Sequence, residues 1–92
     1  MDQHALYESL AQAGFQVSEF VDHPGSFGSW YVCVKRGHTE SRLVFDGRDS
    51  MLSLQQPGPS TGWLDIRTQT VSGQQTDFIT LGISWLQECT SA

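Results

Sequence analysis

The sequence predicts an α+β fold of the order α-β-β-β-β-β-α, an antiparallel meander of four to five strands with the N- and C-terminal helices packed on one face. Three observations predict it. Apolar residues recur at helical spacing near both ends of the chain, short alternating segments fill the middle, and glycine or proline separates many segments. The 92 residues, 38% of them hydrophobic, suffice for one core, so we expect a single domain over residues 1–92.

The first helix is predicted near the N-terminus, where Leu6, Leu10 and Ala13 recur at helical spacing. Gly14 is expected to end it, because glycine adopts the left-handed conformation without a steric penalty. A strand is predicted next, followed by a loop over residues 22–29. The segment WYVCVK, residues 30–35, is the strongest strand signal because it is β-branched, aromatic and alternating.

The stretch DGRD, residues 46–49, lies between two apolar runs and could be either a site or the tip of a hairpin. If all four residues form the loop, Leu43 pairs with Leu52 and Phe45 pairs with Ser50. Leu43, Phe45, Leu52 and Leu54 then share one apolar face. Because register follows the buried face, we predict a hairpin tip with this pairing.

The last strand and helix follow a loop over residues 55–62, which contains two prolines and two glycines. The strand, residues 63–71, is expected to place Leu64 and Ile66 on an apolar face and Arg67 on the other. The helix DFITLGISWLQEC, residues 77–89, has a broad apolar stripe that contains Gly82. A glycine inside a helix would be explained by close approach to a strand or an aromatic ring.

The net charge of −5 is unevenly distributed, since residues 1–34 contain four carboxylates and no lysine or arginine. There is no cationic stripe, so nucleic acid is not an expected partner, whereas a basic protein surface is. The N-terminal residues lack the regions of a signal peptide, and no apolar run approaches the roughly 20 residues of a membrane span. We therefore expect a cytoplasmic protein that does not contact the membrane.

The cysteines and glycines do not indicate catalytic chemistry. Cys33 and Cys89 are expected to be reduced core residues, with a disulfide bridge or a reactive thiol as the alternatives. The glycines are scattered, as hairpins require, and form no phosphate-binding pattern. We expect no cofactor and no enzymatic activity.

Two groups of side chains are candidates for contact with a partner. Up-and-down connectivity brings the 22–29 loop and the 46–49 tip to one end of the sheet, where a metal or acid–base site is the alternative. This first group consists of Asp22, His23, Asp46, Arg48 and Asp49. The second group is expected on the face that the helices leave open and consists of Tyr31, Arg42, Trp63 and Arg67. A homodimer that buries this face is the alternative.

Residues 30–63, WYVCV…RLVFDGRDSMLSLQQ…GW, resemble a pattern in small bacterial proteins, in which an aromatic strand precedes a D-G-R-D hairpin and a later Gly-Trp. Such proteins are similar in size and acidity to cytoplasmic immunity proteins, which bind and block a toxin secreted between competing bacteria. The resemblance implies a non-enzymatic protein that occludes a partner protein, and it assigns no functional residue.

Three other protein classes are alternatives to this interpretation. An acidic secretion or assembly chaperone of the type III kind comes second, and a small metal-dependent enzyme comes third. The core is also similar to the double-stranded RNA-binding domain, but SGQQTDF, residues 72–78, lacks the basic residues that this family needs.

Overall fold

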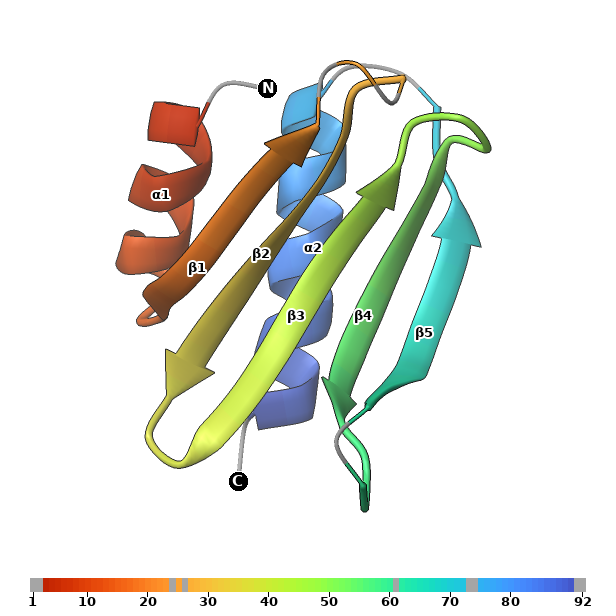
Figure 1. Ribbon diagram of the computed structural model, residues 1–92. Coiled ribbons are helices and arrows are strands. Elements are labelled where there is room, and N and C mark those ends of the chain that lie inside the picture. The colour runs from red at the N-terminus through yellow and green to blue at the C-terminus, as the bar shows by residue number, and fades with distance from the viewer. Residues whose placement is uncertain (1–2, 24, 26, 61, 73–74, 91–92) are drawn as a thin grey trace.

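The computed structural model describes residues 3–23, 25, 27–60, 62–72 and 75–90. The elements in chain order are α1 (Gln3–Gln12), β1 (Gln16–His23), β2 (Ser29–Arg36), β3 (Thr39–Asp46), β4 (Met51–Pro57), β5 (Trp63–Thr70) and α2 (Gln75–Thr90). The strands form one antiparallel sheet in the order β1-β2-β3-β4-β5 (Figure 1). The predicted fold class is confirmed.

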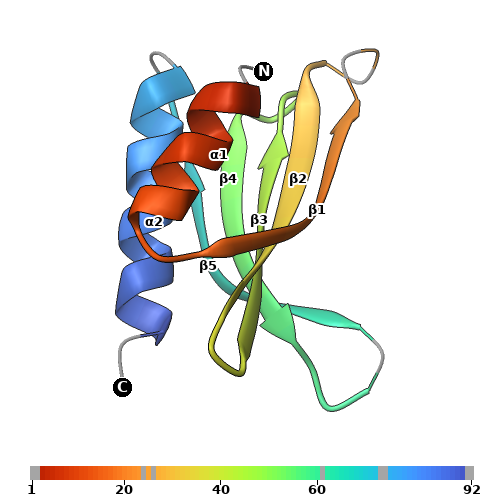
Figure 2. The same ribbon diagram turned by 90° about the vertical axis from the view of Figure 1, so that its left-hand side faces the viewer.

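Both helices lie on the same face of the sheet, as predicted (Figures 1 and 2). α1 packs against β1 and α2, and α2 packs against β3 and β4. The opposite face carries no helix, and we refer to it as the open face. Neither helix, over the residues described, combines the length and the apolar character that crossing a membrane requires.

The core lies between the helices and the sheet, because alternate residues of the strands point toward the helices. Val32, Leu43 and Leu54 are among its fully buried side chains. A row of aromatic rings crosses this layer, with ring centroids 5.1–6.4 Å apart: Phe20, Trp30, Phe45 and Phe78. Four aromatic residues belong to this core or pack against it: Phe20, Phe45, Phe78 and Trp85.

Gly82 of α2 lies directly on β3. A Cβ atom at residue 82 would come within 2.8 Å of Leu43 Cδ1, which is closer than real Cβ contacts allow. The expectation that close approach to a strand explains this glycine is confirmed. The helix can lie this close to the sheet only because residue 82 has no side chain.

The hairpin between β3 and β4 differs from the prediction in register. Leu43 pairs with Leu54 and Phe45 pairs with Leu52, so that the loop consists of residues 47–50 and Asp46 still belongs to β3. The prediction that residues 46–49 form the loop, with Leu43 opposite Leu52, is therefore wrong by two residues. The shared face of the four apolar residues is nevertheless correct, because a shift of two residues does not change the side to which a side chain points.

Strand β5 also differs from the prediction, because its pairing with β4 contains a bulge. Leu54 pairs with Arg67 and Gln55 pairs with Asp65, which leaves Ile66 as an extra residue. Arg67 consequently lies on the same face as the buried Leu54, so its predicted position on the open face is wrong. Leu64 and Ile66 do not form a buried apolar face either, since 51% and 47% of their surface remain exposed.

Candidate functional site: the open face of the sheet

A continuous row of side chains crosses the open face from the first strand to the last. Its members come from consecutive strands and are Glu19, Tyr31, Arg42, Gln55 and Asp65. We call this set the polar row. Each strand contributes one residue to it. Glu19, Arg42, Gln55 and Asp65 lie at the level of Cys33 on β2. Tyr31 joins them from the next position of β2 on the same face, two residues before Cys33.

Hydrogen bonds and cation–π contacts connect the members of the polar row. Tyr31 Oη donates to Glu19 Oε1 at 3.1 Å. The guanidinium carbon of Arg42 lies 5.2 Å from the centre of the Tyr31 ring, and Arg42 Nε donates to Gln55 Oε1 at 2.8 Å. Gln55 Nε2 in turn donates to Asp65 Oδ1 at 2.8 Å. The amide of Gln55 therefore has one orientation, with its oxygen toward Arg42 and its nitrogen toward Asp65.

Arg42 is the centre of the row because it also contacts Trp63. Its guanidinium carbon lies 4.4 Å from the centre of the Trp63 ring. A cation over an aromatic ring at an exposed site contributes about 0.5–1 kcal/mol, so the two ring contacts together fix the position of Arg42. The result is a half-buried cluster of tyrosine, arginine and tryptophan on a rigid sheet.

Two groups on this face have raised pKa values. The hydrogen bond from Tyr31 to Glu19 stabilises the protonated phenol and raises the pKa of Tyr31, with desolvation as a smaller cause. Burial raises the pKa of the Cys33 thiol, and the charge of Glu19 adds to the effect. A thiol with a raised pKa remains protonated at neutral pH, so Cys33 is not activated as a nucleophile.

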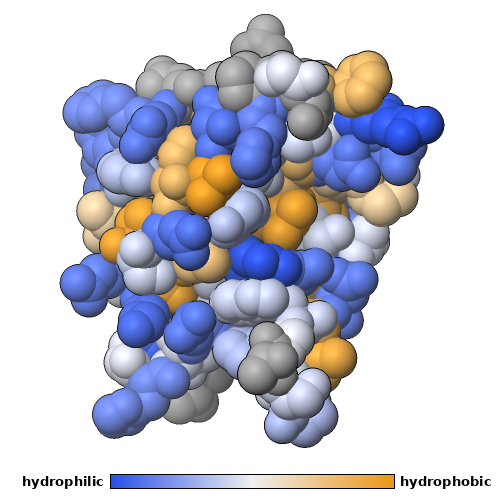
Figure 3. All heavy atoms as spheres, viewed as in Figure 1, coloured by the Kyte–Doolittle hydropathy of each residue, from blue (hydrophilic) through white to orange (hydrophobic). Residues whose placement is uncertain are grey.

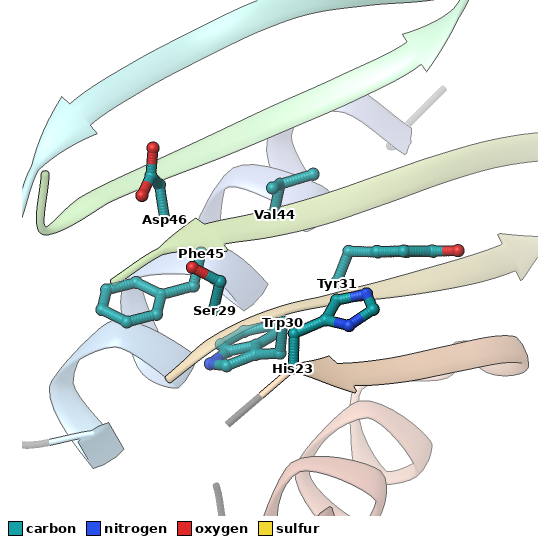
Figure 4. A pocket seen from close by; sticks show the side chains of 7 residues that line it. All are labelled: His23, Ser29, Trp30, Tyr31, Val44, Phe45 and Asp46. Atoms are coloured by element: carbon teal, nitrogen blue, oxygen red, sulfur yellow. The ribbon is translucent and has the colours of Figure 1, made fainter. Parts of the chain in front are cut away.

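A shallow hollow of about 290 Å³ lies on the open face, toward the end of the sheet where His23 ends β1, Ser29 begins β2 and the 47–50 loop follows β3. Its lining residues come from β1, β2 and β3 and are His23, Ser29, Trp30, Tyr31, Val44, Phe45 and Asp46 (Figure 4). Figure 3, in the same view as Figure 1, shows apolar surface on this face next to strongly hydrophilic surface. Val21 and Val44 are half-buried residues of the face.

The 47–50 loop beside the hollow packs tightly against Phe27 and Ser29, so the two connections lie at one end of the sheet, as up-and-down connectivity predicts. The backbone N–H of Gly47 donates to Ser29 Oγ at 2.9 Å, and a Cβ at residue 47 would lie only 1.8 Å from the carbonyl oxygen of Phe27. Phe27 itself has a φ of 60° and is 71% exposed. Residue 47 must therefore be glycine for the loops to meet in this way.

Asp46 has a structural role within the hairpin. Its Oδ1 accepts hydrogen bonds from the backbone N–H groups of Arg48, at 3.0 Å, and Asp49, at 3.4 Å. A side chain that accepts backbone bonds two and three residues further on closes an Asx turn. The carboxylate is thereby held at the edge of the hollow.

The structure brings together only some of the residues predicted as a site. Tyr31, Arg42 and Trp63 form the expected cluster on the open face, while His23 and Asp46 line the hollow. Asp22 pairs with Trp30 and shares the helix-covered side with it, so that it diverges from His23. Arg48 and Asp49 are exposed on the hairpin tip.

Arg67 occupies a different environment from the other predicted contact residues. It donates from Nη1 to Glu88 Oε2 at 2.8 Å, and its guanidinium carbon lies 5.6 Å from the centre of the Trp85 ring. Both partners belong to α2. Arg67 therefore connects β5 to the helix layer.

Among the described residues, no group of three or more histidine, cysteine, aspartate or glutamate side chains is arranged to hold a metal ion. This finding includes Asp22, His23, Asp46 and Asp49, which all lie in the described part of the chain.

The members of the row that the sequence did not reveal are Glu19, Gln55 and Asp65. The only signal that could have found Gln55 is its pairing with Arg42, which depends on the hairpin register.

Neither a protein-family model, nor a curated protein, nor a solved structure matches this chain. The geometry of the open face therefore provides the basis for a functional proposal.

Proposed function

We propose that this protein is a non-enzymatic binding module that docks one partner protein on the open face of its sheet and occludes the partner's functional surface, as immunity or antitoxin proteins do. The observation that carries the proposal is the cluster of Tyr31, Arg42 and Trp63 on a sheet face that no helix covers, with Arg42 on the central strand β3. Tyrosine, arginine and tryptophan are the residue types in which interfaces concentrate their binding energy.

The size of the open face supports this proposal. Strands about 4.8 Å apart and residues rising about 3.3 Å each give a face of roughly 24 Å by 26 Å, or about 600 Å² before side-chain relief is included. A stable protein–protein interface buries about 800 Å² on each partner. One side of the sheet, with the adjoining loops, can therefore supply a complete interface.

The charge of the protein supports a cationic partner. We propose that the two proteins meet in the cytoplasm. The chain has a net charge of −5, and the polar row has a carboxylate at each end, Glu19 and Asp65, with the single cation Arg42 between them. An acidic surface accelerates association with a basic one and disfavours acidic competitors. A toxin with a basic active site is the partner class that fits an occluding immunity protein.

The proposal can be tested by photo-crosslinking in the native cell. A photoreactive phenylalanine analogue is placed at Lys35 or at Thr70, which are both exposed positions on the open face. The matched control carries the analogue at Gln87, which is an exposed position on α2. We expect one protein to be captured from positions 35 and 70 but not from position 87. Equal capture from position 87 would place the interface elsewhere.

Two further steps separate occlusion from simple contact. Arg42→Ala and Trp63→Ala should each weaken the captured complex by about 30-fold, the effect of removing a central contact worth about 2 kcal/mol. The captured protein, expressed alone, should arrest growth, and coexpression of this chain should restore it. A captured protein that is held as an extended, unfolded segment and has no activity to block would instead indicate a secretion chaperone.

A further inference from the structure

The hollow beside the polar row combines an apolar floor with one fixed negative charge. Val44 and the ring of Tyr31 provide apolar surface, whereas Asp46 stands on one side and His23 on the other (Figure 4). The side chain of Trp30 is buried under the helices, and Phe45 stacks on Phe78, so these two residues contribute mainly backbone to the hollow.

The carboxylate of Asp46 is held in place and can still accept further hydrogen bonds. Its Oδ1 accepts from the backbone of Arg48 and Asp49, which fixes the orientation of the group. Over the described residues, no group of the chain hydrogen-bonds to its second oxygen, and no lysine or arginine lines the hollow. A carboxylate that is already oriented by the fold loses little entropy when it binds a cation.

We propose that the hollow is the anchor site for a single arginine side chain of the partner protein, which deepens the proposed function and rests on it. The three-carbon stem of the arginine lies over Val44 and Tyr31, and its guanidinium donates to Asp46. Arginine fits this site better than lysine because its planar head is weakly hydrated and offers parallel N–H donors to a carboxylate. It fits better than a phenyl ring because a ring would leave the Asp46 carboxylate without a partner.

The same face already holds one arginine in this manner. The guanidinium of Arg42 lies over the rings of Tyr31 and Trp63 and donates to the side-chain oxygen of Gln55. An aromatic surface beside an oxygen acceptor is thus an environment that this sheet provides for a guanidinium. The hollow offers a second such combination, with Asp46 as the acceptor and without an arginine of its own among the lining residues.

The experiment is a titration of the isotope-labelled protein, followed by the shifts of its backbone amide signals. The probe is N-acetyl-arginine methylamide, and the matched control is the citrulline derivative, which has nearly the same shape and no charge. At millimolar concentrations and constant ionic strength, we expect the arginine probe to shift the amides of His23, Tyr31, Val44 and Asp46. The citrulline probe should bind about threefold more weakly, because it lacks the charge that pairs with the exposed carboxylate.

Variants of the protein locate the binding. Asp46→Asn retains an oxygen that can close the Asx turn but removes the charge, so it should weaken the arginine probe about threefold. Asp49→Asn makes the same charge change on the exposed tip and should leave binding unchanged. Val44→Phe fills the hollow with a residue that strands accept and should abolish the shifts, whereas Thr70→Phe, outside the hollow on the same face, should not.

Several results would overturn the arginine anchor. They are equal binding of arginine and citrulline, stronger binding of the lysine derivative, shifts confined to residues outside the hollow, and equal effects of Asp46→Asn and Asp49→Asn. A dispersed amide spectrum of each variant shows that it is folded. Because crosslinking from positions 35 and 70 does not depend on the hollow, failure of the anchor can be told apart from failure of the open face as an interface.

Discussion

The contact between Gly82 and Leu43 allows a quantitative test of where α2 lies. Gly82→Ala should have two opposing effects on the free energy of unfolding. Alanine favours the helix by about 1 kcal/mol over glycine. The new methyl group, however, would approach Leu43 Cδ1 to 2.8 Å and Cδ2 to 3.3 Å in a fully buried position, and overpacking of this kind costs about 1–3 kcal/mol. We expect a net destabilisation of about 1 kcal/mol.

A double-mutant cycle separates the two effects. Leu43→Ala alone should cost about 4 kcal/mol, because it removes a fully buried leucine and leaves a cavity. In the double variant the clash disappears while the gain in helix propensity remains, so the loss should be about 3 kcal/mol. The double variant is then about 2 kcal/mol more stable than the two single effects would give if they were additive. Denaturation by urea with linear extrapolation measures all four free energies.

A matched control makes the cycle specific to this contact. Gly62 lies in the loop before β5, where a Cβ would meet no atom within 4 Å, so Gly62→Ala and Leu43→Ala should be additive within about 0.5 kcal/mol. An additive result for Gly82 and Leu43, or a simple stabilisation by Gly82→Ala, would show that α2 does not press on β3. The assignment of the open face, which depends on the position of α2, would then lose its support.

Three further outcomes are expected. Gly47→Ala should lower the midpoint of thermal unfolding markedly, because the added methyl group would collide with the backbone carbonyl of Phe27, which cannot rotate away. Glu19→Gln should lower the pKa of Tyr31 toward its ordinary value of 10.0 in a titration followed by tyrosine NMR. Since folding raises that pKa, the parent protein should lose stability as pH rises above about 10, and this loss should be smaller in the variant. Cys89 is exposed, contrary to the expectation that it is a core residue, so a thiol reagent should modify it at once. In a Cys89→Ser variant the buried Cys33 should react only at the rate at which the protein opens, and immediate reaction in native buffer would contradict its burial.

The order of helices and strands could be predicted because two signals place the element boundaries at the same positions. Residues that favour turns lie between the segments, and each segment has the hydrophobic period of a helix or of a strand. Gly37 is one example, since the turn between β2 and β3 uses a positive φ of 61° there. The cluster of Tyr31, Arg42 and Trp63 could be predicted for the same reason. Tyr31 and Arg42 each lie between two buried neighbours on their strands. The sequence of residues 63–71 alternates, so that Trp63 is separated from Leu64.

The register of the β3–β4 hairpin could not be predicted, because an apolar pattern of period two is unchanged by a shift of two residues. Local chemistry decides between the two registers. Asp46 remains in β3 and closes the turn with its side chain, while Ser50 adopts a φ of 51° at the other end of the loop. A serine in the left-handed region is uncommon, so the sequence favoured a loop that began at Asp46.

The bulges in the two edge strands determine the charge of the open face. In β1 the pairing shifts between Val17 and Glu19, which places Val17 toward the helices and Glu19 on the open face. In β5 the extra residue Ile66 leaves Asp65 on the open face and moves Arg67 to the helix side, where it pairs with Glu88. Regular strands would keep residues 17 and 19, and likewise residues 65 and 67, on the same face.

The consequence is a polar row with a carboxylate at each edge strand and a single arginine at its centre. If β5 were regular, Arg67 would lie beside Asp65 on the open face and neutralise that end of the row, and the face would carry no excess of negative charge along this line. With the bulge, Arg67 instead connects β5 to α2, on the side of the sheet opposite the open face. The proposed preference for a basic partner therefore depends on the placement of one extra residue in an edge strand, where an irregularity interrupts pairing on one side only.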